Sequence, residues 1–158
     1  MSPSICRAGL YCKPDCYPHC TLFNIMLLRI HHAAIICSDY QRSKDFYVNI
    51  LGLRIVAEHY RAARDSYKLD LALPDGSQLE LFSFPNSPAR PSRPEAQGLR
   101  HLAFAVADVA QCKLALEAKG VAVEEIRRDE FTGKLYTFFA DPDDLPLELY
   151  ETAGATVL

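Results

Sequence analysis

The sequence Leu-Glu-Leu-Phe at residues 79–82 returns as Leu-Glu-Leu-Tyr at residues 147–150, so its glutamate recurs after 68 residues. Two histidines, His32 and His101, recur with a separation of 69 residues. Nearly equal separations for unlike residue types indicate a duplication, because a repeat carries its whole pattern along the chain. The repeat therefore predicts two copies of one module, each with a histidine near its start and a glutamate near its end.

The pattern around these strings predicts one strand, one helix and three further strands in each module. In the first module the helix is predicted over 38–51 and the strands over 27–36, 53–59, 67–73 and 78–84. In the second the helix is predicted over 108–119 and the strands over 99–107, 121–127, 135–140 and 145–150. Ser38 or Asp39 fits an N-cap, and Gly52 and Gly120 fit helix ends. We expect an α+β fold of two tandem βαβββ modules forming curved mixed sheets.

Three segments lie outside the modules, which we place at 26–84 and 99–151. Residues 1–25 hold four of the six cysteines without a regular period, and we interpret them as an N-terminal extension, disordered or outside the native protein. Their cysteine spacing is looser than that of common zinc motifs. Residues 85–98 are too rich in proline for a central strand and predict a Pro/Arg-rich linker loop. Residues 152–158 form a short tail.

Composition narrows the class of protein. The chain has 158 residues, a formal net charge of −3, 49% hydrophobic residues and 23% charged residues. This apolar content argues against a disordered chain, and no apolar run is long enough for a membrane-spanning helix. The slightly acidic balance gives no basic surface for nucleic acid. Only two cysteines lie in the modules, which favours a reduced, cytoplasmic protein.

The repeated histidine and glutamate indicate a metal site. His32 and Glu80 are 48 residues apart, and His101 and Glu148 are 47 apart. A carboxylate inside an apolar strand costs several kcal/mol unless it has a partner. One such residue alone is more often an ordinary core or surface residue, but a repeated pair is hard to obtain by accident. If the modules pair symmetrically, the four side chains converge and a divalent cation explains their placement.

Longer strings resemble the vicinal oxygen chelate superfamily. The segments 30–36 and 46–53 are similar to the opening of that family, and 100–104 and 141–149 are similar to its second half. The likeness extends over about residues 27–151. It is strongest to small bacterial glyoxalase I-like proteins and their glyoxalase/bleomycin-resistance relatives.

The resemblance implies a site, a partner and a reaction. His32, Glu80, His101 and Glu148 would be ligands of one divalent ion per site, namely nickel, zinc, cobalt or manganese. Small members usually form homodimers in which each site takes one module from each subunit. The implied reaction is that of a lyase or isomerase of the glyoxalase I (lactoylglutathione lyase) type. It passes through a metal-chelated enediolate of a small α-oxygenated substrate, with a thiol hemithioacetal as one candidate. Glu148 is the preferred base and Glu80 the symmetric alternative.

Two positions depart from the glyoxalase I pattern. Ile36 stands where that enzyme often has an arginine for glutathione, and Asp144 stands where a glycine commonly closes a turn. The thiol is therefore left open. Arginine is favoured for carboxylate recognition, and aromatic rings suit an apolar pocket. The candidates for substrate contact are Arg64, Lys68, Arg93, Arg100, Phe82 and Phe138.

Other functions of the family stay open as alternatives. One is a resistance protein of the fosfomycin or bleomycin type that binds an antibiotic or transfers a thiol to it. Retention of all four ligands opposes simple sequestration, because bleomycin-binding relatives generally lack them. The other is an extradiol dioxygenase, which uses two histidines and one carboxylate on iron. Glu80, as an extra ligand, opposes that interpretation.

Overall fold

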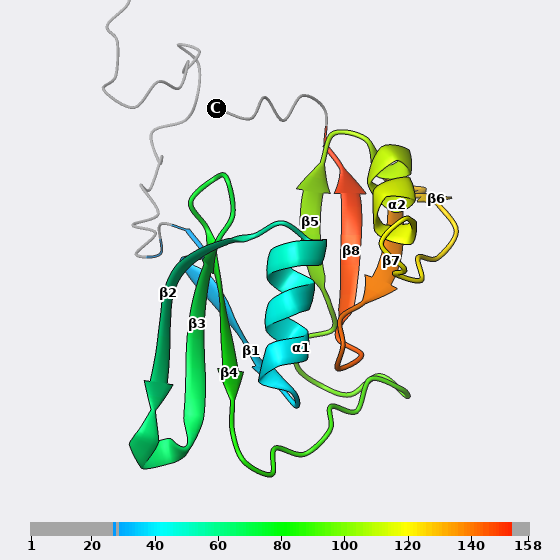
Figure 1. Cartoon of the computed structure of the whole chain (residues 1–158). Helices are drawn as coiled ribbons and strands as arrows, with labels where there is room; N and C mark the ends of the chain where they lie inside the picture. The colour runs from blue at the N-terminus through cyan, green and yellow to red at the C-terminus, as the bar shows by residue number, and fades with distance from the viewer. Residues whose placement is uncertain (1–26, 28, 153–158) are drawn as a thin grey trace, which may run out of the picture.

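The computed structural model of the chain describes residues 27 and 29–152, and these residues form two four-stranded mixed sheets (Figure 1). The first sheet has the order β1-β4-β3-β2, from β1 (His32–Cys37), β2 (Arg54–Arg61), β3 (Ser66–Ala72) and β4 (Gln78–Ser83). The second has the order β5-β8-β7-β6, from β5 (Leu102–Val106), β6 (Arg127–Arg128), β7 (Leu135–Ala140) and β8 (Pro146–Glu151). The identical order confirms the predicted α+β fold and its duplication.

The helices begin and end near the predicted residues. Helix α1 (Tyr40–Asp45) continues into the π-helical segment η1 (Phe46–Ile50), and α2 is Val109–Glu117. The carboxylates of Asp39 and Asp108 accept hydrogen bonds from backbone N–H groups at 3.0 and 2.9 Å, as N-caps do. Gly52 and Gly120, at φ +80° and +82°, end these helices in the left-handed region that favours glycine. No helix in the described part of the chain could span a membrane.

Three predicted strands are wrong in extent, and the smallest error is at 99–107, where β5 is only Leu102–Val106. The segment 27–36 is a strand only from His32, because its neighbour β4 begins at Gln78, opposite His32. Before that point Leu27 and Ile30 are 82% and 78% exposed. The segment 121–127 is mostly irregular, with one isolated bridge at Val123 and the two-residue β6.

In the segment 121–127, backbone carbonyls accept hydrogen bonds from side chains and not from a neighbouring strand. The Lys113 ammonium donates to the carbonyls of Val123 and Glu124, each at 3.0 Å. The Thr137 hydroxyl also donates to the Glu124 carbonyl, at 2.8 Å. Apolar residues of the segment, Val121, Val123 and Ile126, still pack against the core. The apolar pattern of residues 121–127 therefore predicted correctly that the segment packs against the core, but it predicted wrongly that the segment forms a strand.

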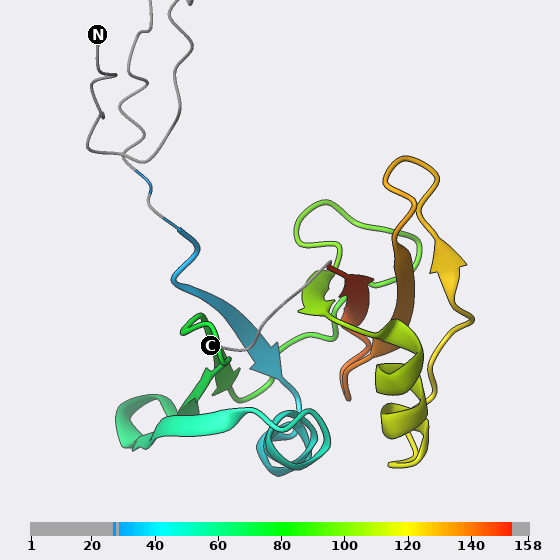
Figure 2. The same ribbon diagram turned by 90° about the horizontal axis from the view of Figure 1, so that it is seen from above.

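One hydrophobic core joins the two modules. It contains Leu69, Leu71, Leu79 and Leu81 of the first sheet, and Phe139, Leu145, Leu147 and Leu149 of the second module. Helix α1 lies between the sheets, and both helices lie on one side of the molecule (Figures 1 and 2). The rings of Phe46 and Phe139, one from each module, lie 6.4 Å apart. The core therefore occupies one face of each sheet and leaves the other face for polar side chains.

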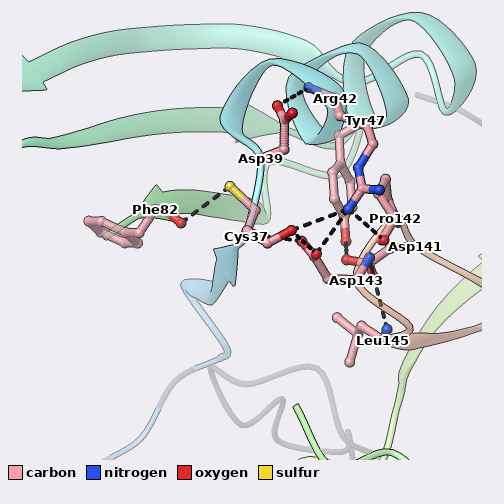
Figure 3. Close-up of polar contacts among 10 residues, drawn as sticks. Cys37, Asp39, Arg42, Tyr47, Phe82, Asp141, Pro142, Asp143 and Leu145 are labelled. Atoms are coloured by element: carbon pink, nitrogen blue, oxygen red, sulfur yellow. Dashed lines mark hydrogen bonds and ion pairs between the residues drawn. The ribbon is translucent and has the colours of Figure 1, made fainter. Parts of the chain in front are cut away.

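Polar contacts reinforce this junction at the turn before β8 (Figure 3). We call these residues, Ser38, Arg42, Tyr47, Asp141 and Asp143, the inter-module clasp. The buried Tyr47 hydroxyl donates to the Asp141 carboxylate at 2.9 Å, and the Asp143 carboxylate accepts from the Ser38 N–H at 2.9 Å and from Arg42 at 3.1 Å. Asp141 also accepts from the N–H groups of Asp143 and Leu145, both at 2.8 Å. Burial raises the pKa of the Asp141 carboxyl, because a carboxylate is less stable away from water. The hydrogen bonds that Asp141 accepts oppose this effect and favour the ionised form.

The substitution Tyr47→Phe tests the clasp. Removal of the hydroxyl takes one donor from a buried carboxylate, so we expect the free energy of unfolding to fall by about 1–3 kcal/mol. Urea denaturation measures it. Tyr60→Phe is the control, because Tyr60 is 54% exposed and donates to the carboxylate of Asp65 at the surface. Its effect should stay within about 0.5 kcal/mol. Equal effects of the two changes would contradict a structural role for the buried bond.

Candidate metal centre

The first module places His32 beside Glu80. Glu80 lies in β4 between Leu79 and Leu81, which both point into the core, so alternation directs its carboxylate to the other face of the sheet. His32 opens β1, which runs parallel to β4. Its Nε2 lies 3.6 Å from Glu80 Oε2. His31 does not contact Glu80, but its Nδ1 lies 3.0 Å from His32 Nδ1 and leaves Nε2 of His32 directed at the carboxylate.

The second module repeats the arrangement with His101 and Glu148. Glu148 lies between the buried Leu147 and Leu149 in β8, and only 8% of it is exposed. His101 directly precedes β5, and its Nε2 lies 2.9 Å from Glu148 Oε2. The His101 ring meets the Phe138 ring edge to face at 5.2 Å. Nδ1 of His101 is buried and has no hydrogen-bond partner among the described residues.

The donor chemistry of each pair fits a divalent transition metal. Imidazole nitrogen and carboxylate oxygen bind such ions at about 2.0–2.2 Å, which places two neighbouring ligands about 3–3.4 Å apart. The observed separations of 3.6 and 2.9 Å lie close to this range. Within residues 27 and 29–152, however, no three His, Cys, Asp or Glu side chains cluster as a metal site requires. The four predicted residues therefore lie in one chain as two separate His–Glu pairs, which we call the first and second half-sites after the centre that they are predicted to form.

Lys68 and Asp70 extend the first half-site. The Lys68 ammonium lies 2.9 Å from Glu80 Oε1 and also bonds the Asp70 carboxylate. Asp70 is the cross-strand neighbour of Glu80 in the β3–β4 pair. Lys68 was expected to contact substrate, whereas Asp70 was not singled out. The signal was present in the sequence, since Lys68 and Asp70 alternate with the buried Leu69 and Leu71 and so share the face of Glu80.

A cavity of about 1340 Å³ opens at the second half-site. His101 and Glu148 line it, together with Arg93, Arg100 and Phe138, three of the residues expected to contact substrate. Arg127 also lines the cavity and was not predicted as a site residue, because no repeat or motif marks it. Its guanidinium lies 5.1 Å from the ring centroid of Tyr136 and 5.4 Å from that of Phe138. The cavity therefore combines aromatic surface with charged side chains of both signs.

The remaining expected substrate residues lie on the first module. Phe82 stacks on Phe84 with ring centroids 5.9 Å apart, and the Arg61 guanidinium lies 5.0 Å from the Phe82 ring. Arg64 is exposed in the 3-10 turn η2 (Ala62–Arg64) between β2 and β3. Of the two neighbouring arginines, Arg61 is therefore the one that joins the aromatic face.

Cys37 takes no part in this chemistry. Burial raises the pKa of its thiol to about 11, and the thiol donates to the carbonyl of Phe82 at 3.3 Å. A thiol that is protonated at neutral pH is a poor nucleophile and a poor metal ligand. Cys37 is therefore a structural residue of β1.

The chain matches known proteins over both modules. A family model described as Glyoxalase/Bleomycin resistance protein/Dioxygenase superfamily matches residues 29–149. The uncharacterized protein YwkD of Bacillus subtilis is 57% identical over 80% of this chain and 99% of its own length. The uncharacterized protein YaeR of Escherichia coli is 58% identical over 79% of this chain and 97% of its own. The crystal structure of a glyoxalase family protein from Enterococcus faecalis is 50% identical, with a TM-score of 0.73 over 78% of this chain and 97% of that one.

More distant structures share the fold alone. A glyoxalase I mutant from Zea mays has a TM-score of 0.69 at 20% identity, over 80% of this chain and 45% of that one. TnmS3, an antibiotic binding protein from Streptomyces, has a TM-score of 0.61 at 24% identity, over 82% and 99%. The same pair of modules therefore occurs in an enzyme and in a binding protein.

Proposed function

Because the chain belongs to the Glyoxalase/Bleomycin resistance protein/Dioxygenase superfamily, we propose that it is a divalent-metal-dependent lyase or isomerase of the glyoxalase I type. One observation carries the proposal: each module presents a histidine Nε2 beside a glutamate Oε2, at 3.6 and 2.9 Å. The substrate is a small α-oxygenated compound, with the hemithioacetal of an aldehyde and a thiol as the first candidate. Ile36 provides no cation for glutathione at its position, so the thiol is a matter for experiment.

The complete site requires two copies of the chain. His32 and Glu80 of one subunit would hold the ion together with the second-module pair of the other subunit. The absence of a three-ligand cluster among the described residues of one chain supports this homodimer. Nickel, zinc, cobalt or manganese, when bound, would supply Lewis acidity toward two neighbouring substrate oxygens.

Glu148 is the better placed of the two carboxylates for proton transfer. Both oxygens of Glu80 have a neighbour, because Lys68 donates to Oε1 and the His32 ring lies beside Oε2. Glu148 has no such ammonium neighbour among the described residues, and it lines the cavity with only 8% of its surface exposed. In the proposed reaction Glu148 takes the proton from the carbon that bears the hydroxyl and sulfur and returns it to the adjacent carbonyl carbon. The hemithioacetal becomes a thioester with no net loss or gain of atoms.

Metal uptake is the first test. The full-length protein, dialysed against nickel, zinc, cobalt or manganese, should retain about one ion per subunit by elemental analysis and should melt at a higher temperature than the metal-free protein. His32→Ala and His101→Ala should each lose most of this uptake. Glu117→Gln is the control, because Glu117 pairs with Lys113 on the exposed face of α2. A wild-type protein that neither retains metal nor gains thermal stability would contradict the proposal.

Mixing of two inactive variants tests the shared site. His32→Ala and His101→Ala should each lack intact sites. A mixed dimer has both changes in one site and neither in the other, so unfolding and refolding the two together should restore metal to about a quarter of the subunits. The mixture would stay metal-free if each site formed within one chain.

Turnover tests the base. Metal-loaded protein should convert the hemithioacetal of methylglyoxal with glutathione or another thiol of a panel. Glu148→Gln should lower kcat by about a hundredfold or more, the usual scale of a general base, while substrate still binds. Glu117→Gln again serves as the control. If metal binds but no hemithioacetal is turned over, the antibiotic-binding type of function is favoured instead.

A further inference from the structure

The two half-sites differ on the strand beside each glutamate. In the first module, Asp70 lies opposite Glu80 and Lys68 lies opposite Phe82. In the second module, the equivalent register places Phe138 opposite Glu148 and Tyr136 opposite Tyr150. The first module therefore has the ion pair of Lys68 and Asp70 at the positions where the second module has the rings of Tyr136 and Phe138. A cation at this position is not needed to build the sheet, since the second module does without it.

Lys68 has a hydrogen-bond donor to spare. A lysine ammonium has three N–H donors. Asp70 and Glu80 accept two of them, and none of the described residues accepts the third. The Lys68 side chain is 26% exposed, and its ammonium lies beside Glu80. The two carboxylates fix the ammonium in place, which lowers the entropic cost of using it for recognition.

A second cation, Arg61, lies near Lys68. The Lys68 ammonium lies 5.9 Å from the Phe82 ring centroid, and the Arg61 guanidinium lies 5.0 Å from the same centroid. Nε of Arg61 is buried without a partner among the described residues. Two cations thus flank one ring beside the half-site. Asp70 and Glu80 balance this charge, so recognition of an anion depends on the positioned N–H donor of Lys68 and not on a net positive field.

We propose that Lys68 selects substrates that carry a carboxylate on the oxygenated carbon, namely 2-hydroxy acids, in which that carbon also bears the proton that Glu148 would take. The inference rests on the proposed function, because it assigns the substrate class of the same site. One carboxylate oxygen and the neighbouring α-oxygen form the vicinal pair that the ion requires. The second carboxylate oxygen accepts the free N–H of Lys68. A chelator without that third oxygen gains nothing from Lys68.

The test compares two chelators on metal-loaded, full-length protein. Oxalate and acetohydroxamate both offer two vicinal oxygens, but only oxalate has further carboxylate oxygens. For Lys68→Met we expect the Kd of oxalate, measured by titration calorimetry, to rise about tenfold or more, as for loss of a charge-assisted hydrogen bond. The Kd of acetohydroxamate should change less than about twofold. Lys68→Gln serves as a second variant, and Lys134→Met, outside both half-sites, should leave both constants unchanged.

The outcomes separate the two proposals. Retained metal with an unchanged oxalate Kd in both Lys68 variants, or with equal losses for the two chelators, would overturn the role of Lys68 and leave the metal site intact. Failure of the wild type to take up metal would overturn the proposed function and this inference with it. Elemental analysis of every variant before titration decides between these cases.

Discussion

The hydrophobic core shared by the two modules is the constraint on which their arrangement depends, and the hydrogen bond between Tyr47 and the buried carboxylate of Asp141 reinforces it at the turn before β8. Tyr47 follows α1 of the first module, and Asp141 opens the turn that leads into β8 of the second. Asp141 also binds two backbone N–H groups of that turn, which holds Asp144 at φ +62° and buries Leu145. One carboxylate therefore connects the modules and shapes the approach to the strand that carries Glu148.

Alternation along β4 and β8 links this core to the candidate site. Leu79 and Leu81 bury their side chains on the core side, and Glu80 between them must point to the other face. Leu147 and Leu149 do the same for Glu148. The same residues that stabilise the fold thus orient the carboxylates, so a change of register by one residue would bury the charge and expose the leucines.

The two modules share one strand order, but they differ in the side chains beside each glutamate. Both modules keep a histidine and a glutamate in contact, which is what a shared ion requires. The neighbouring strand carries Lys68 and Asp70 in one module and Tyr136 and Phe138 in the other. In the proposed two-chain site, one half would present the Lys68–Asp70 ion pair and the other an aromatic surface, so the two sides of the site would differ in chemistry.

The sequence by itself determined the duplicated α+β fold, the helix ends and the pairing of His32 with Glu80 and of His101 with Glu148, because these depend on local periodicity, capping and repeated spacing. It misjudged 27–36 and 121–127, since a strand needs a neighbour and apolar residues alone do not supply one. Only the tertiary structure decided that the Lys68 ammonium binds both Asp70 and Glu80, that Arg127 lies near the rings of Tyr136 and Phe138, and that the two His–Glu pairs stay apart in one chain. Those facts depend on cross-strand register and on the packing of segments far apart in the chain, which no local pattern encodes.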